Sequence, residues 1–177
     1  TLLADDGVST AFVVTGADAG TMTGLGGGFS EIENLTGGTS GDSFQLTGGT
    51  LTGAVVGGVG AAGDTLLADD GVSTAFVLTG VDAGAMTGLG GGFSDIENLS
   101  GGMADDLFMA SSGTTLTGMM RGRAGSDQFT IAPDTGVSFQ VNGGLHSTLS
   151  GDVLTVTGQA ELPVDDGAAV TTVESGI

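Results

Sequence analysis

Phe76-Val77-Leu78-Thr79-Gly80 is a stretch to which this 177-residue chain returns several times. A close variant begins at Phe12, one 64-residue period earlier, and another begins at Phe44, halfway between the two. More divergent versions begin at Phe108 and Phe139. Self-similarity at a fixed period of this length is typical of stacked repeat proteins, in which each unit buries its apolar side only against its neighbours.

The repeat organises the whole chain. Thr1-Leu2-Leu3-Ala4-Asp5-Asp6 is identical to residues 65–70, so a 64-residue repeat covers residues 1–64 and 65–127. Each copy contains two 32-residue units, and degenerate units cover residues 128–177. We therefore expect one continuous array along the chain and not two globular halves.

Each 32-residue unit carries three short strand signals, separated by turns rich in glycine and aspartate. The first signal is the Phe stretch, in which apolar and variable residues alternate with the period of a strand. The second reads Thr-Leu-Thr-Gly or a variant of it, and the third is an aliphatic stretch such as Ile32-Glu33-Asn34-Leu35. These signals predict an all-β fold: a right-handed parallel β-helix (β-solenoid) with three strands and about 32 residues per coil, its coils ~4.8 Å apart.

This fold predicts that equivalent side chains stack in columns inside the coils. The first column holds the residues that open the first strands: Phe12, Phe44, Phe76, Phe108 and Phe139. The second holds the inward residues of the second strands: Met22, Leu51, Met86, Leu116 and Leu149. Phe129 is assigned to a third strand. A propeller is the alternative architecture, but its blades need four antiparallel strands and about 40 or more residues.

The charge of the chain excludes several classes of partner. There are 21 Asp and Glu residues against 2 Lys and Arg, and the formal net charge is -19 at pH 7. Nucleic acids and anionic membrane surfaces need basic footprints, so neither is expected as a partner. No apolar run reaches the ~18 residues of a membrane span, so no membrane insertion is expected. The sequence has no Cys, which excludes disulfides and thiolate chemistry.

The expected solenoid lacks a cap at either end, because neither end of the sequence carries an amphipathic helix or a polar outer coil. Uncapped ends expose unpaired strands and an apolar cross-section. We therefore expect the partner to be the protein itself, through head-to-tail stacking or within a longer chain of the same repeats.

An acidic turn before the first strand of each unit is the first candidate site. Stacked carboxylates on glycine-rich turns repel one another unless solvent or cations intervene, and hard oxygen ligands of this kind suit Ca²⁺. The candidate ligands are Asp6, Asp42, Asp70, Asp106, Asp127, Asp134 and Asp166. The alternative is that Asp and Gly only form turns on a solvated edge, with no cofactor.

Outward-facing threonines on the second strands are the other candidate site: Thr21, Thr23, Thr50, Thr52, Thr87, Thr115 and Thr117. Two regular ranks of hydroxyls would resemble the ice-binding face of β-solenoid antifreeze proteins, or would bind another surface. The alternative is a Thr ladder that stabilises the sheet through cross-strand contacts. Ala85 and Ser150 interrupt the ranks.

Catalysis has little basis in this sequence. His146 is the single His, and Arg121 and Arg123 are the only strong bases. Acidic pairs such as Asp69-Asp70 could serve as acid and base in a polysaccharide-active enzyme. These pairs recur with near-identical surroundings, however, whereas an active site is a local exception. We therefore do not expect an enzyme.

Several turns resemble the glycine-rich repeats of the calcium-binding RTX toxins and adhesins: residues 37–44, 101–108 and 122–129. With Glu-Asn-Leu-Thr-Gly-Gly (33–38) and its echo at 97–102, they make nearly the whole chain similar to repeat regions of giant secreted bacterial β-solenoid proteins, the RTX-type and haemagglutinin-like adhesins.

The resemblance implies an extracellular, structural or adhesive rod on a bacterial surface, with an extracellular surface or a glycan as a further partner. One departure concerns the metal. In the RTX family the repeats run in tandem, so that consecutive turns hold one ion between them. Here each copy is solitary, and Arg123 replaces a glycine.

Overall fold

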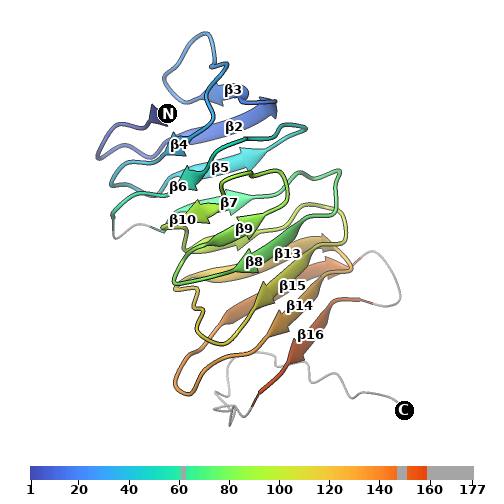
Figure 1. Ribbon diagram of the computed structural model, residues 1–177. Coiled ribbons are helices and arrows are strands. Elements are labelled where there is room, and N and C mark those ends of the chain that lie inside the picture. The colour runs from blue at the N-terminus through green and yellow to red at the C-terminus, as the bar shows by residue number, and fades with distance from the viewer. Residues whose placement is uncertain (61–62, 147–150, 159–177) are drawn as a thin grey trace.

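The computed structural model describes residues 1–60, 63–146 and 151–158, and within these ranges the fold is all-β with no helix. Two sheets, of nine strands (sheet A) and seven strands (sheet B), extend from the N-terminal to the C-terminal part of the molecule (Figure 1). Most neighbouring strands pair in parallel, and the antiparallel pairs are confined to two hairpin regions. The all-β, largely parallel character predicted from the sequence is therefore confirmed.

In spatial order, sheet A contains β1 (Leu2–Leu3), β4 (Leu35–Thr36), β6 (Val55–Val56), β10 (Phe93–Ser94), β9 (Gly84–Met86), β8 (Ala75–Leu78), β12 (Leu107–Ala110), β14 (Gln128–Ile131) and β16 (Val153–Val156). Sheet B contains β15 (Gln140–His146), β13 (Met119–Gly125), β11 (Asn98–Ser100), β7 (Thr65–Leu67), β5 (Ser43–Leu46), β2 (Ala11–Gly16) and β3 (Ala19–Met22).

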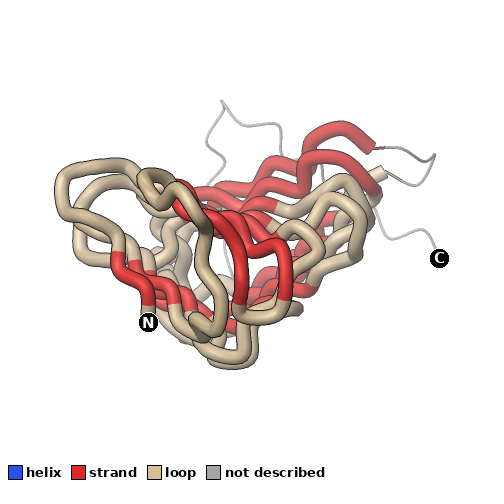
Figure 2. Tube along the Cα trace, turned by 90° about the horizontal axis from the view of Figure 1, so that it is seen from above, coloured by secondary structure: helices blue, strands red, loops and turns tan. Residues whose placement is uncertain are grey.

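The chain passes alternately between the two sheets. β1 lies in sheet A, β2 in sheet B, β4 in sheet A and β5 in sheet B, and the alternation continues to β15 and β16. One circuit, from a strand to the next strand of the same sheet, spans 22 residues at Asp42 and Asp64 and 21 residues at Asp106 and Asp127. Seen along the stack, successive loops overlie one another (Figure 2).

Two circuits are longer because each contains a β-hairpin. In the first hairpin β2 folds back on β3, with Phe12 opposite Met22. In the second β8 folds back on β9, with Phe76 opposite Met86. The parallel pairing of β2 with β5, and of β8 with β12, then spans 32 residues. The 32-residue spacing is thus one circuit plus one hairpin from Phe12 to Phe44 and from Phe76 to Phe108. From Phe44 to Phe76 the same spacing is one and a half circuits without a hairpin.

The predicted coil of three strands is not confirmed, because a circuit of this chain contributes one strand to each of two sheets. The second strand signal forms β3 and β9 in the hairpins, but only isolated bridges at Thr50, Leu51 and Thr115. A β-prone segment extends into a ladder only where a partner backbone runs beside it, and the hairpins supply that partner.

Equivalent strands of the 64-residue repeat lie in opposite sheets. β1 lies in sheet A and its sequence equivalent β7 in sheet B, while β2 lies in sheet B and its equivalent β8 in sheet A. Over one 64-residue repeat the chain passes from one sheet to the other five times, which makes two and a half circuits. This half circuit decides which side chains stack.

The single phenylalanine column predicted from the sequence is therefore wrong, and two stacks form instead. In sheet B, Phe12 and Phe44 stack with ring centroids 4.9 Å apart. In sheet A, Phe108 stacks on Phe76 at 4.8 Å and on Phe129 at 4.7 Å. Phe129, assigned from the sequence to a third strand, belongs to this second stack.

The second predicted column is not formed either. Met22 and Met86 face Phe12 and Phe76 within the hairpins, while Leu51 forms a parallel bridge with Leu89. Leu149 lies outside the described residues.

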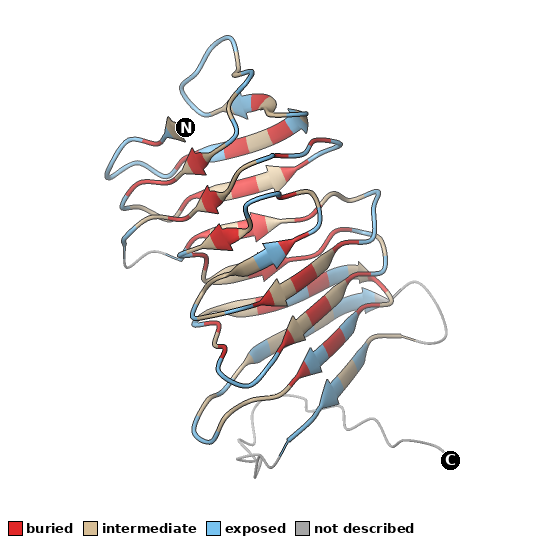
Figure 3. Ribbon diagram, viewed as in Figure 1, coloured by how far each residue is buried: buried red, intermediate tan, exposed pale blue. Residues whose placement is uncertain are grey.

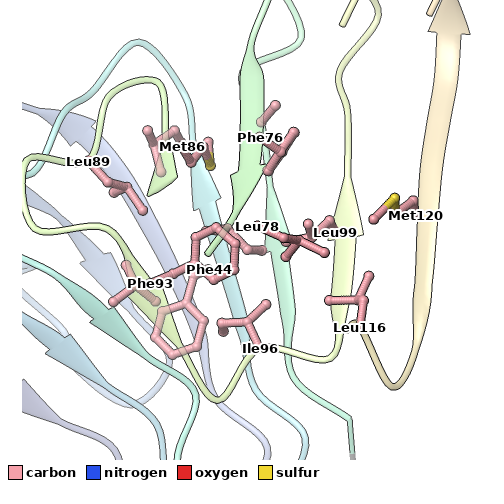
Figure 4. Packing of buried hydrophobic residues seen from close by; sticks show 14 of the residues in the cluster. Phe44, Phe76, Leu78, Met86, Leu89, Phe93, Ile96, Leu99, Leu116 and Met120 are labelled. Atoms are coloured by element: carbon pink, nitrogen blue, oxygen red, sulfur yellow. The ribbon is translucent and has the colours of Figure 1, made fainter. Parts of the chain in front are cut away.

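Phe139, expected in the first column, packs only partly buried against the core. The core itself lies between the sheets, where buried and less buried residues alternate along strands such as β5 and β12 (Figure 3). Side chains of β5, β8 to β11 and β13 meet there (Figure 4). Each circuit thus buries its apolar face against the next circuit, as stacked repeats require.

Candidate functional site: aspartate ladders inside the turns

The turns that precede the strands hold buried aspartates, which bond to the backbone of neighbouring circuits. Oδ1 of Asp42 accepts the N–H of Thr10 at 2.6 Å, and its Oδ2 accepts the N–H of Gly38 at 2.7 Å. The N–H of Asp42 in turn donates to Oδ1 of Asp64 at 2.7 Å, and the N–H of Asp64 donates to Oε2 of Glu97 at 2.6 Å. We call this chain of hydrogen bonds the first ladder.

A second ladder repeats this arrangement in the later circuits. Asp106 accepts the N–H groups of Thr74 and Gly102, each at 2.7 Å. The N–H of Asp106 donates to Oδ1 of Asp127 at 2.8 Å, and the N–H of Asp127 donates to Oδ1 of Asp152 at 3.0 Å. Each ladder therefore links at least three circuits. The links are carboxylates in turns, and these turns lie outside the strand pairing of the two sheets.

Each ladder aspartate stands two residues before an inward-facing Phe or Leu: before Phe44, Leu66, Phe108, Phe129 and Leu154. Thr10 and Thr74 occupy this position before Phe12 and Phe76, where they donate to the ladders instead of accepting. This two-residue spacing was the sequence signal for Asp64 and Asp152. Both were missed because carboxylates were sought in acidic turns and not at a fixed sequence distance before a core residue.

Burial raises the pKa of Asp64 and of Asp127 to about 6. Desolvation is the largest cause in both cases, and nearby carboxylates add to it. A backbone N–H bonded to each carboxylate acts in the opposite direction. Burial also raises the pKa of Asp106, although two backbone N–H groups oppose the change.

Asp127 differs from the other ladder residues. Its side chain is fully buried, and its Oδ2 has no hydrogen-bond partner. At Asp42 and Asp106 this oxygen is satisfied by a glycine N–H four residues earlier, and Arg123 occupies that position before Asp127. Arg123 adopts a left-handed backbone (φ 76°), and its side chain pairs with Asp70 at 2.8 Å on the surface. Arg123 has a backbone N–H as the two glycines do, but neither glycine has a positive φ, and in this differently shaped turn one buried carboxylate oxygen of Asp127 is left unsatisfied.

The structure does not gather the candidate calcium ligands into one site. No group of three His, Cys, Asp or Glu side chains that could hold a metal occurs in residues 1–60, 63–146 and 151–158. Both carboxylate oxygens of Asp42 and of Asp106 already accept backbone N–H groups, so the turns are closed by the protein itself. These residues do not fit the open oxygen cage that Ca²⁺ requires.

The other candidate ligands lie apart from the ladders. Asp6 is exposed, and Asp70 bonds Arg123. Asp134 accepts hydrogen bonds from the Ser112 hydroxyl and the Gly113 N–H. Asp166 lies outside the described residues.

The candidate threonines do not form one flat face. Thr21 and Thr23 belong to the hairpin of sheet B and Thr87 to the hairpin of sheet A. The remaining four lie in turns of opposite sense: Thr50 and Thr52 lead from sheet B to sheet A, and Thr115 and Thr117 lead from sheet A to sheet B.

Several of these hydroxyls have structural partners. The hydroxyl of Thr52 donates to Asp18 at 3.0 Å, and that of Thr117 donates to Asp82 at 2.9 Å. The hydroxyl of Thr87 accepts the N–H of Ala75 at 3.1 Å. These contacts agree with the alternative expectation, in which threonines stabilise the β-surface.

Two surface hollows of the described residues were compared with the acid–base pair that an enzyme of this kind would need. One hollow is lined by Ser112, Pro133, Asp134 and Thr157, and another by Leu116, Val137 and Gln140. Neither hollow is lined by an arginine, and Arg123 pairs with Asp70 elsewhere on the surface.

Comparisons of the chain with family models, with curated proteins and with solved structures gave no match. Within the described residues there is no helix long and apolar enough to cross a membrane.

Proposed function

We propose that this chain is a structural or adhesive segment of an extracellular bacterial surface fibre or giant adhesin, built as a β-solenoid with two strands per circuit. The observation that carries the proposal is the unbroken succession of paired strands in both sheets, reinforced by the two aspartate ladders. Such a molecule works mechanically, because every circuit is hydrogen-bonded to the next.

The charge and the sequence resemblance support the extracellular assignment. A net charge of -19 keeps neighbouring rods soluble by mutual repulsion. The similarity of the Gly- and Asp-rich turns to secreted adhesin repeats points to the same setting. Adhesion to a glycan or another extracellular surface is part of this proposal. The self-association partner is a repeat of the same kind, stacked on the end of the rod.

Electron microscopy of the purified protein at several concentrations tests the proposal. We expect filaments or end-to-end oligomers that lengthen with concentration. Monomeric particles at every concentration, with a matching sedimentation coefficient, would remove the stacking part of the function. The same grids prepared with calcium and with chelator test the calcium expectation, and the closed Asp42 and Asp106 turns lead us to expect equal lengths in both.

Ice binding through the threonines is not favoured, since the threonines are divided between two hairpins and between turns of opposite sense. A polysaccharide-active enzyme is not favoured either, since neither of the two hollows lined by Asp134 and by Gln140 combines an acid with a base. Absence of ice shaping and of polysaccharide cleavage are the expected results of the two direct assays.

A further inference from the structure

The two hairpins are nearly identical in sequence but differ in burial. Residues 24–30 and 88–94 both read Gly-Leu-Gly-Gly-Gly-Phe-Ser. In the second hairpin Leu89 is 8% exposed, whereas its equivalent Leu25 is 41% exposed. The same contrast holds at three further pairs, buried in the second hairpin and partly buried in the first: Met86 and Met22, Phe93 and Phe29, Ile96 and Ile32.

An earlier turn of the same chain covers the second hairpin. The N–H of Leu51 donates to the carbonyl of Gly88 at 2.9 Å, and the N–H of Gly90 donates to the carbonyl of Leu51 at 2.8 Å. β10 then pairs in parallel with β6, with Phe93 opposite Val55. Residues 50–58 therefore form the surface on which the second hairpin is seated.

Two glycines show how close this contact is. A Cβ on Gly90 would collide with the carbonyl oxygen of Thr52, and a Cβ on Gly91 would lie 2.8 Å from the nitrogen of Ala54. A Cβ added to their equivalents Gly26 and Gly27 would meet nothing within 4 Å, and neither residue has a positive φ. In the first hairpin these two glycines thus lack a side chain, as a close backbone contact requires, but no other backbone among the described residues lies against them.

We propose that the first hairpin is a docking surface for a turn with the sequence Thr-Leu-Thr-Gly-Ala-Val-Val-Gly-Gly, that of residues 50–58, supplied by another 64-residue repeat of this kind. The docking surface consists of Met22, Leu25, Phe29 and Ile32, with Gly26 and Gly27 at its centre. The inference rests on the proposed function and names the contact through which repeats stack.

The alternation of the sheets fits this occupant. β6 and the hairpin seated on it both belong to sheet A. A repeat placed one period earlier would have its β6 equivalent in sheet B, because equivalent strands change sheet from one repeat to the next. The first hairpin lies in sheet B, so the incoming strand meets it on the matching side. The free edge of β1 would then take a β5 equivalent, as β7 takes β5 within this chain.

The test is a variant of the full chain in which residues 1–64 are repeated once ahead of Thr1. The new junction reproduces the natural Asp64-Thr65 junction, since residues 1–6 and 65–70 are identical. The added copy carries Met22→Leu, so that peptide mass spectrometry can distinguish the original Met22 from its equivalent in the added copy. The rates of oxidation of Met22 and Met86 by hydrogen peroxide are then compared.

In the unextended chain we expect Met22 to oxidise faster than Met86. In the extended chain the expected result is loss of this difference, with Met22 protected as Met86 is. Protection of Met86 in both chains reports that the original part is folded. A Met22 that stays as reactive in the extended chain, beside a protected Met86, overturns the proposal.

Gly26→Ala provides the matched control. In the unextended chain its methyl meets open space, so it should leave the unfolding midpoint unchanged. In the extended chain the same substitution, made at the original Gly26, should restore the fast oxidation of the original Met22. Retained protection of this Met22 would contradict the docking geometry. The outcome is separable from the filament test: protection without filaments upholds this contact and refutes self-stacking, while filaments without protection do the reverse.

Discussion

The backbone N–H of Asp106 donates to Oδ1 of Asp127 at 2.8 Å, while Oδ2 of Asp127 has no partner. Asp106 itself accepts two N–H groups, so two residues in the same ladder differ in how far their carboxylates are satisfied. Their asparagine variants should therefore differ as well.

Asp106→Asn should lower the free energy of unfolding by about 1–3 kcal/mol, because an amide NH₂ would face a backbone N–H that needs an acceptor. Asp127→Asn should cost less at pH 8, because Oδ1 can still accept the Asp106 N–H and a buried charge is removed. Denaturant unfolding of the two variants at pH 8 measures the difference. Equal losses would mean that Oδ2 of Asp127 is satisfied in solution.

Stability should fall as the pH rises from about 4 to about 6. The pKa values of Asp64 and Asp127 are about 6 in the folded protein, above the ~3.9 of an unfolded Asp. The unfolded chain therefore releases these protons first, and the folded state loses at most about 3 kcal/mol per residue across this window. Thermal unfolding at pH 4.5 and pH 8 is the measurement. A midpoint that rises with pH would contradict the raised pKa values.

Two half-buried aspartates set the acid limit of this trend. Hydrogen bonds from the Gly71 and Gly48 N–H groups lower the pKa of Asp69, and hydrogen bonds from the Ser112 hydroxyl and the Gly113 N–H lower that of Asp134. Their stabilising effect is present above the unfolded pKa and is lost as the pH falls through the lower folded value. We therefore expect the unfolding midpoint to pass through a maximum near pH 4.

Phe76→Ala should reduce the free energy of unfolding by about 3–5 kcal/mol, because a buried aromatic ring is lost from a stack. Phe139→Ala is the comparison, since Phe139 is only partly buried and belongs to neither stack. Its cost should be clearly smaller in the same denaturant titration. A near-neutral Phe76→Ala would show that the sheet A stack does not hold the core.

Gly90→Ala and Gly26→Ala form a matched pair at equivalent positions of the two hairpins. The first places a methyl against the Thr52 carbonyl and should lower the unfolding midpoint. The second meets open space and should not change it. Differential scanning calorimetry of both variants is sufficient, and a similar loss in both would show that Gly26 is already in contact with another backbone.

The sequence predicted the β class, the parallel pairing and the inward phenylalanines, because alternation of apolar residues is a local signal. It did not predict two strands per circuit. A 32-residue period gives the distance at which a sequence pattern recurs, but not the number of circuits that the chain makes over that distance. A hairpin such as β8–β9 adds residues without adding a circuit.

The candidate site was predicted in part, and for a related reason. Asp42, Asp106 and Asp127 were identified from their turns, but as metal ligands, since the backbone donors that satisfy them come from residues such as Thr10 and Thr74, 32 residues away. Partners at that separation become visible only when the circuits are stacked. Asp64 was missed because the segment that follows it, residues 66–68, was assigned to a third strand, whereas acidic turns were sought before the first strands.

The hairpins also bear on the curvature of the rod. In sheet A the hairpin places β9 and β10 between β6 and β8, whereas β5, β7 and β11 are direct neighbours in sheet B. Two extra strands make sheet A longer than sheet B by about 10 Å in this region, at ~4.8 Å per strand. The first hairpin adds strands to sheet B and the second adds strands to sheet A, so successive hairpins would bend an array of repeats in opposite directions. An array of such repeats would therefore stay straight over long distances.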